Sequence, residues 1–408
     1  MNNEVNFVPL KQLCIEVIDC PHSSPKWQKE GIPVIRNYNL KDGKIDLTNM
    51  SYVDEETYKK RIKRANPEYK DLVISREAPM GVAAIVPPDF KCCMGQRLVL
   101  LKVNKKICIP EYLLCAIQSQ FVQTQIKRIN QTGSIISNLN IPDLESLVIP
   151  MIGMNMQLKI ANIYNCISNK IENNNAISSQ LESLAKTIYD YWFLQFDFPD
   201  ENGNPYRSSG GKMVWNDELK REIPEGWEVK NLQGLFNEKR GISYTSKNIK
   251  SNVGMPMINL ACINTNREYR DGELKYYEGN LKNKTVLHGG ELLVACTDLT
   301  RNADIIGCPI FVPEDEKEYL YTMDLVQILP SQKYFDELYF GKMLQTDYYH
   351  NYIKKWASGT NVLHLNLDGM RWYKTWIPPL PLQKRFSSII KNIAKFMKNV
   401  ATRSLNLA

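Results

Sequence analysis

The residues best suited to chemistry in this sequence are basic side chains, because Lys and Arg neutralise phosphate groups and release bound counterions. The densest cluster is Tyr58-Lys-Lys-Arg-Ile-Lys-Arg64, which holds five basic residues. A solvated helix face would have the same composition. We predict phosphate contacts from this cluster and from a sparser one later in the chain: Lys59, Lys60, Arg61, Lys63, Arg64, Lys282 and Lys284.

Side chains that can read base edges lie beside several short apolar runs. Base reading favours Arg for guanine and Asn or Gln for adenine, because these groups donate and accept in pairs. We predict base contacts from nine residues on expected loops: Arg36, Asn37, Arg76 and Gln131 in the first half, and Asn264, Arg267, Arg270, Arg301 and Asn302 in the second.

Motifs for catalysis are incomplete. An adenine methyltransferase needs a glycine-rich cofactor loop and Asn/Asp-Pro-Pro-aromatic, and Asn204-Pro205-Tyr206 is one proline short. Met213 follows Gly211-Lys212 where a phosphate-binding loop needs Ser or Thr. Acid-x-Lys triplets such as Glu273-Leu-Lys275 are common by chance. We therefore expect a binding protein that is not an enzyme.

Metal and redox motifs are missing as well. The ten cysteines form no C-x-x-C pair, and the four histidines form no H-E-x-x-H motif. Cysteines in apolar runs, such as Cys296 after Leu292–Ala295, behave as small buried hydrophobes. We predict no metal site and no cofactor in this chain.

Charge and hydropathy set wider limits. The 408 residues include 51 Lys and Arg against 44 Asp and Glu, a net charge of +7 that permits a nucleic-acid partner without proving one. We find no apolar run of about 18 residues and no secretory pattern at the start. We expect no membrane association and a cytoplasmic location.

The elements that position these residues repeat at a period near 225. Gly31-Ile-Pro-Val-Ile35 returns as Gly254-Met-Pro-Met-Ile258, and Asp71–Ser75 returns as Glu291–Ala295. Leu139-Asn140-Ile141 returns as Leu365-Asn366-Leu367, and Ile149-Pro150 with Gln157 returns as Ile377-Pro378 with Gln383. Two copies of one unit explain these matches economically.

Each copy reads as mixed strands and short helices. We expect strands at 33–37, 71–75, 82–86 and 98–103, then at 257–260, 291–295, 304–306 and 325–329. Short helices are expected at 110–119 and 334–346.

A long helix follows each copy. Apolar residues at 3-4 spacing, interrupted by Lys170 and Asn174, predict a coiled-coil seam in the first helix, and a shorter, basic second helix repeats it. Two ordinary amphipathic helices, each packed on its own domain, are the alternative. The predicted pairing residues are Ile160, Ile163, Ile167, Ile177, Leu181, Leu184, Ile188, Phe386, Ile389, Ile393 and Val400.

Three segments near the middle carry a family resemblance. Tyr189–Pro199 (YDYWFLQFDFP), Ser208–Trp215 (SSGGKMVW) and Ile223-Pro-Glu-Gly-Trp227, together with the duplicated unit, resemble the specificity subunit of Type I restriction-modification systems. The resemblance covers nearly the whole chain.

The resemblance implies an α+β fold with two similar mixed α/β target-recognition domains. Each would precede a long helix, and the helices would pair as an antiparallel coiled coil with pseudo-twofold symmetry. It also implies recognition of a bipartite double-stranded DNA site and docking of methyltransferase subunits, two in number, with restriction subunits as possible further partners. S-adenosylmethionine, and ATP with Mg for restriction, would then be bound by partner subunits.

The predicted organisation is target-recognition domain 1 over 1–150, a central helix over 151–198, a linker over 199–222, target-recognition domain 2 over 223–380 and a short C-terminal helix over 381–408. The alternative interpretations are a stand-alone coiled-coil DNA-binding regulator and a truncated, inactive specificity subunit.

Overall fold

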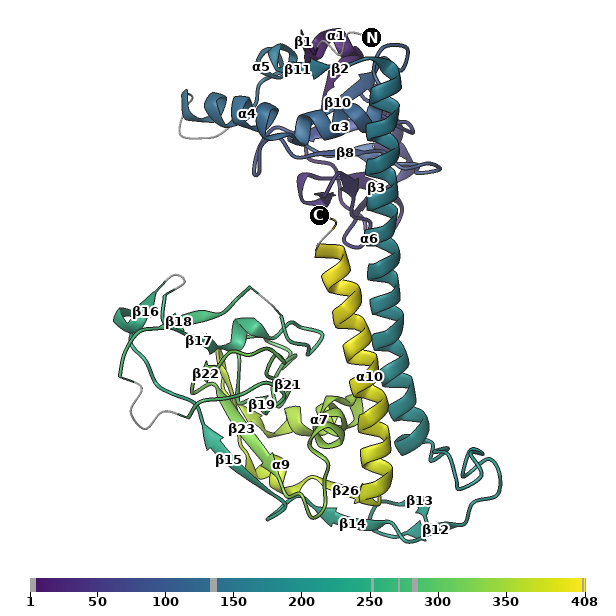
Figure 1. Cartoon of the computed structure of the whole chain (residues 1–408), viewed down its shortest axis with the longest axis vertical. Coiled ribbons are helices and arrows are strands. Elements are labelled where there is room, and N and C mark those ends of the chain that lie inside the picture. The colour runs from purple at the N-terminus through teal and green to yellow at the C-terminus, as the bar shows by residue number, and fades with distance from the viewer. Residues whose placement is uncertain are drawn as a thin grey trace. The chain divides into compact units, whose positions relative to one another are not determined.

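The computed structural model describes residues 5–132, 138–250, 253–270, 272–280, 285–405 and 407. The chain divides into two compact units, which we call unit 1 (residues 1–174 and 404–408) and unit 2 (residues 175–403). Figure 1 shows both units with the larger part of their elements labelled. None of the helices in the described ranges has the length and apolar composition of a membrane span.

Unit 1 is built on a four-stranded antiparallel sheet with the strand order β2-β10-β7-β8. Both faces of this sheet are covered, so its central strands are apolar at nearly every position. Leu72 and Ile74 of β7 face one core cluster, whereas Val73 faces another. The alternation follows from the two-residue period of a strand. Helix α3 adds Leu113 and Ile117 to the first cluster.

Smaller strand groups complete unit 1. β3 pairs in parallel with β9 and antiparallel with β6, and β1 pairs with β11. The elements of unit 1 are β1 (Asn6–Pro9), α1 (Leu10–Leu13), β2 (Cys14–Asp19), β3 (Ile32–Ile35), η1 (Asn37–Asn39), β4 (Leu40–Lys41), β5 (Lys44–Ile45), β6 (Ser51–Val53), α2 (Glu55–Ile62), β7 (Leu72–Ser75), β8 (Ala83–Ile85), β9 (Cys93–Met94), β10 (Leu98–Val103), α3 (Pro110–Gln118), α4 (Gln120–Thr132), α5 (Ile141–Ser146), β11 (Val148–Met151) and the first part of α6 (Met154–Tyr189).

Unit 2 repeats this plan. Its four-stranded sheet has the order β15-β23-β19-β21, β17 pairs in parallel with β22, and β14 pairs with β26. The elements of unit 2 are the end of α6, η2 (Asp190–Leu194), β12 (Met213–Asn216), β13 (Arg221–Pro224), β14 (Glu228–Asn231), β15 (Phe236–Arg240), η3 (Ser246–Asn248), β16 (Ile249–Lys250), β17 (Met255–Ile258), η4 (Leu260–Cys262), β18 (Lys275–Tyr277), β19 (Leu292–Ala295), β20 (Thr297–Asp298), β21 (Pro309–Phe311), β22 (Leu320–Tyr321), β23 (Leu325–Pro330), α7 (Glu337–Gln345), α8 (Asp347–Ile353), η5 (Lys354–Trp356), β24 (Ala357–Ser358), β25 (Leu363–Leu365), α9 (Asp368–Trp372), β26 (Lys374–Ile377) and α10 (Leu380–Leu405).

The duplication extends to single side chains. Gln157 accepts a hydrogen bond from the backbone N–H of Ile109 at 3.0 Å and donates to the backbone carbonyls of residues 107 and 152. Gln383 accepts from the N–H of Asp336 at 2.9 Å and donates to the carbonyls of residues 334 and 378. Both amides are buried. Each therefore fixes the start of its long helix to a loop of its own unit.

One predicted strand is wrong. Residues 304–306 form a turn, and the fourth strand of the sheet is β21, which begins at Pro309. The reason is Asp298, whose buried carboxylate accepts hydrogen bonds from the N–H groups of Ile305 and Ile306 at 2.7 and 3.0 Å. Those donors are unavailable to a sheet ladder. The other predicted strands and the two short helices lie within a few residues of the observed elements.

The long helices use their faces differently from the predicted seam. In unit 1, Ile160 packs on the core together with Tyr164, whereas Ile163 is exposed. In unit 2, Ile188 joins the core, whereas Ile177 and Leu184 are exposed. The face of α6 that packs on the cores also contains small and polar residues, such as Gln157, Ala161 and Ala185, which a search for large apolar residues does not detect. Of the other seam residues, Phe386 and Val400 are buried, Ile389 and Ile393 pack against the core of unit 2, and Ile167 and Leu181 are half-buried.

The end of α6 runs antiparallel to α10. The rings of Tyr189 and Phe386 are 5.7 Å apart, and Asn174 donates to the hydroxyl of Ser404 at 3.0 Å, so residue numbers fall along one helix as they rise along the other. The aromatic residues that follow α6 enter the core of unit 2, where Phe196 lies 5.5 Å from the ring of Trp376.

Candidate nucleic-acid interface

The basic run on α2 divides into buried and exposed side chains. Asp54 caps the helix, so the helix starts at the next residue. Lys59 and Lys63 are exposed, and Lys60 forms an exposed ion pair with Glu56 at 2.6 Å. Such a surface pair contributes little to stability. These three lysines can therefore meet phosphate groups without disturbing the fold.

Arg61 does not belong to this exposed set, and its predicted DNA contact is wrong. The side chain is 5% exposed. Its guanidinium donates to the backbone carbonyls of Met94, Ser23 and Pro21 at 2.9, 3.0 and 3.4 Å. Burial lowers the pKa of Arg61 below its ordinary value. The residue joins α2 to β9 and to the loop after β2.

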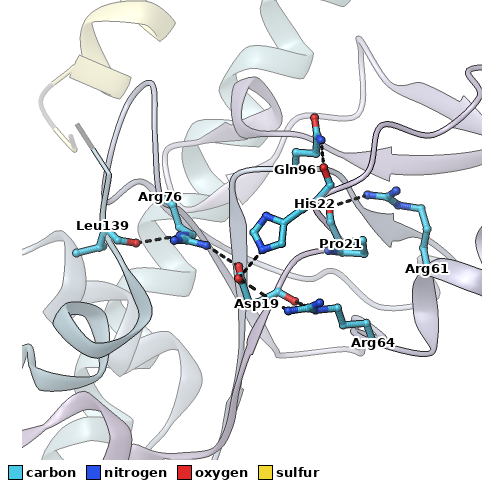
Figure 2. A network of polar contacts seen from close by, with 8 residues as sticks. All are labelled: Asp19, Pro21, His22, Arg61, Arg64, Arg76, Gln96 and Leu139. Atoms are coloured by element: carbon cyan, nitrogen blue, oxygen red, sulfur yellow. Dashed lines mark hydrogen bonds and ion pairs between the residues drawn. The ribbon is translucent and has the colours of Figure 1, made fainter. Parts of the chain in front are cut away.

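Asp19, at the end of β2, gathers further basic side chains in unit 1, as Figure 2 shows. Its carboxylate accepts from Arg76 at 2.8 Å and lies 2.9 Å from a ring nitrogen of His22. Arg76 also donates to the carbonyl of Leu139 at 3.0 Å. Arg76 is thus an internal tie, which contradicts its prediction as a base reader. Arg64 donates to the Asp19 carbonyl at 3.1 Å but remains half exposed, which leaves it able to approach a phosphate.

Unit 1 also contains a stack that the sequence reasoning missed. The guanidinium of Arg36 lies 5.0 Å from the ring centroid of Trp27 and 4.8 Å from that of Tyr38. The Ser51 hydroxyl is 2.9 Å from the Tyr38 hydroxyl and accepts from Arg36 at 3.4 Å. Both rings are 42% exposed. Exposed aromatic faces can stack on bases or sugars. In the sequence Arg36 lies two residues before Tyr38 but nine after Trp27, so only the Arg36–Tyr38 half of the stack had a local signal.

Asn37 follows Arg36 on the 3₁₀ turn η1. Its amide donates to the carbonyl of Ala78 at 2.7 Å, which ties this turn to the loop after β7. One amide hydrogen is therefore already in use. Gln131 lies in the last turn of α4, but its side chain is outside the described part of the chain. Lys282 and Lys284 lie outside the described residues altogether.

In unit 2, the predicted readers between residues 264 and 270 are engaged within the protein. Asn264 accepts from the N–H of Glu268 at 2.9 Å and donates to its carboxylate at 3.2 Å, closing a turn. Arg267 forms an ion pair with Asp347. Arg270 pairs at 2.9 Å with an acid three residues later and stays half exposed. Local pairing thus engages part of the polar groups of Asn264 and Arg267, and base reading by these residues stays a prediction.

The loop after β20 presents the exposed pair Arg301 and Asn302. The buried Asp298 anchors this loop, since its carboxylate also accepts a hydrogen bond from the N–H of Thr300 at 2.6 Å. A buried anchor under an exposed Arg-Asn pair gives a rigid platform for polar recognition. The counterpart of β19 in unit 1 is β7, which leads directly into a loop, whereas in unit 2 the short strand β20 of a separate three-stranded sheet comes between β19 and this loop.

Other chemistry finds no support in the described ranges. No three His, Cys, Asp or Glu side chains gather there as a metal site would require. Seven of the ten cysteines are buried. Burial raises the pKa of Cys92 and Cys296 to about 12, so these thiols are not nucleophiles.

A comparison with family models matches this chain twice to the Type I restriction modification DNA specificity domain, over residues 2–183 and 224–406. The chain belongs to this family. The match confirms both the resemblance stated from the sequence and the internal duplication. Each specificity domain takes in one globular unit and its long helix.

Several relatives of the specificity family are similar in sequence. The Type I restriction enzyme MjaIX specificity subunit of Methanocaldococcus jannaschii is 27% identical over 59% of this chain and 56% of the relative. The EcoBI specificity subunit of Escherichia coli is 24% identical over 32% of this chain and 27% of the relative. The chain thus spans about half the length, or less, of the relatives it matches.

One solved structure shares the fold. The S subunit of the Type I restriction-modification system from M. genitalium has a TM-score of 0.54 and 17% identity, covering 100% of this chain and 93% of that one. This likeness supports the duplicated α+β fold.

Proposed function

We propose that this chain is the DNA sequence-specificity subunit of a Type I restriction-modification complex. It would recognise a bipartite double-stranded DNA site, with one half-site read by each unit. The observation that carries the proposal is the duplicated specificity domain, in which each copy is built on a four-stranded sheet of the same plan. Two related readers with different loop residues would read two different half-sites.

The chain would supply recognition, and its partners would supply chemistry. We propose that two methyltransferase subunits dock on the long helices and bind S-adenosylmethionine. Restriction subunits that bind ATP and Mg would join them for cleavage. This division agrees with the incomplete catalytic motifs in the sequence, and it makes the activity of the complex depend on a chain that is not itself an enzyme.

Readout would differ between the two units. In unit 1 the exposed lysines of α2 would hold the backbone, and the stack of Trp27, Arg36 and Tyr38 would meet a base or sugar. In unit 2 Arg301 and Asn302 would reach base edges. The recognised sequence would therefore contain a stacking-dependent half and a half read by hydrogen bonds.

The first test is genome-wide mapping of methylated adenine in cells that carry or lack the gene, each with the native methyltransferase. A split motif that disappears with the gene supports the proposal and yields both half-sites. Identical maps would reject it and favour a stand-alone regulator or an inactive specificity subunit.

The second test assigns half-sites to units. R301Q should relax the sequence preference in one half-site, by about 1–3 kcal/mol at a single base pair. W27A should change only the other half. K317Q, which removes an exposed lysine paired with Asp315, is the matched control and should change neither. Changes in both halves from R301Q alone would contradict the division of labour.

A further inference from the structure

Helix α10 has a row of lysines along one face. Lys384, Lys391, Lys395 and Lys398 lie at intervals of seven, four and three residues, which places them within about 60° of one another around the helix. The row is about 21 Å long at 1.5 Å per residue. All four side chains are exposed, and α10 contains no acidic residue.

The opposite face of α10 is the one that packs. Phe386, Ile390 and Val400 are buried, so the lysine row points away from the core of unit 2. Lys398 donates to the backbone carbonyl of Glu314 at 2.6 Å. The other three lysines form no ion pair with any residue in the described ranges, although many other basic side chains do.

Helix stability alone does not account for this row. Lys391 and Lys395 are four residues apart, and Lys398 is three residues further, so like charges face each other on the helix surface. Lys384 lies near the helix N-terminus, where the helix dipole disfavours a positive charge, and the first turn has no acid to offset it. An external anion would relieve both kinds of repulsion.

We propose that this lysine row binds the DNA backbone outside the half-site that unit 2 reads. The inference rests on the function proposed above and adds a sequence-independent contact to it. Duplex DNA presents one negative charge per about 1.7 Å of axis, so a row of this length meets several phosphates at once.

The composition of the face favours DNA over an acidic protein. Protein interfaces are depleted in Lys and enriched in aromatic residues and Arg at their centres. On the same face, the exposed Ser388 lies between Lys384 and Lys391, and the exposed Thr402 follows one turn after Lys398; both are small and polar. Such a surface suits phosphate contact through charge and hydroxyl groups and lacks an apolar anchor.

The test is the salt dependence of DNA binding by the full-length triple variant K384Q/K391Q/K395Q. Gln is as good a helix former as Lys, so α10 should be retained, and circular dichroism checks this. Binding to a duplex with the methylome-derived site and to a scrambled duplex is followed by fluorescence anisotropy between 50 and 200 mM salt. The slope of log affinity against log salt should fall in magnitude by about 2.7, at about 0.9 per lost contact. Over this fourfold salt range the wild type should then lose about 40-fold more affinity than the variant.

The control removes the same number of charges elsewhere in unit 2. The control variant K212Q/K220Q/K317Q has the same net charge as the row variant and leaves the row intact. Each of its three lysines is ion-paired with an acid in the wild type. The proposal requires that only the row variant lowers the slope and that it weakens both duplexes equally. Equal slopes in the two triple variants would overturn it.

Two other outcomes separate this proposal from the proposed function. If the row variant keeps the wild-type slope but loses association with the methyltransferase, the face binds an acidic protein and the DNA contact is refuted. If the wild type does not distinguish the two duplexes, the specificity function fails, whereas a lowered slope in the row variant would still uphold the phosphate contact.

Discussion

Replacing Arg61 by Met tests whether the basic run on α2 is divided as the structure indicates. The guanidinium makes two hydrogen bonds of 2.9 and 3.0 Å to backbone carbonyls and a longer one of 3.4 Å. Met fills a similar volume without a charge. The substitution therefore removes the polar tie between α2, β9 and the loop after β2 while preserving much of the packing.

The expected loss of stability follows from these contacts. Hydrogen bonds from a charged group contribute about 1.5–3 kcal/mol each, so the two short ones give a gross loss of about 3–6 kcal/mol. Removing a buried charge returns part of this, because burial of Arg61 is unfavourable to its charged form, as the direction of its pKa shows. A net local destabilisation of about 3 kcal/mol is expected.

Hydrogen exchange measured by mass spectrometry is the suitable assay, because a chain with two units need not unfold in one step. At about 1.4 kcal/mol per tenfold, peptides covering α2 and β9 should exchange roughly 150-fold faster in R61M. Peptides from unit 2 should not change.

K63Q is the matched control on the same helix. It removes an exposed basic residue two positions away, so it should leave exchange unchanged and reduce the magnitude of the salt slope of DNA binding by about 0.9. The reasoning is refuted if R61M exchanges like the wild type and instead reduces that slope, because Arg61 would then contact DNA.

Three further predictions follow from buried or paired side chains. Q157L and Q383L should each destabilise their own unit by about 3 kcal/mol, because each removes three hydrogen bonds made by a buried amide; hydrogen exchange in the other unit should stay constant. Native labelling with a thiol reagent should modify Cys166 first, since it is exposed, and faster labelling of any other cysteine would contradict the burial pattern. The pKa of Asp347 lies below its ordinary value because Arg267 donates to its carboxylate. The pair therefore stabilises the fold above about pH 4, the pKa of Asp in the unfolded chain, and this stabilisation is lost as the pH falls through the lower pKa of the folded state. In D347N the free energy of unfolding of unit 2, measured by denaturation, should therefore decrease less as the pH is lowered. An unchanged pH dependence would count against the pair.

The sequence alone determined the architecture of this chain. A repeat near 225 residues, strand-length apolar runs and two helical patterns predicted two similar units of mixed strands and helices, and the match to two specificity domains confirmed the family. These features are local, since a strand buried on both faces must be apolar throughout and a long helix must keep an apolar face. They can be read without knowing what each residue touches.

Only the tertiary structure decided which basic residues are free. Arg61 and Lys63 are two positions apart and chemically alike, yet one is buried against carbonyls at 21, 23 and 94 while the other faces solvent. Arg76 is likewise engaged by Asp19, which lies 57 residues earlier in the chain. Such partners are distant in sequence, and a charged side chain is equally suited to an internal tie and to a phosphate. The folded contacts alone separate the two roles, because they determine which donors have already been used.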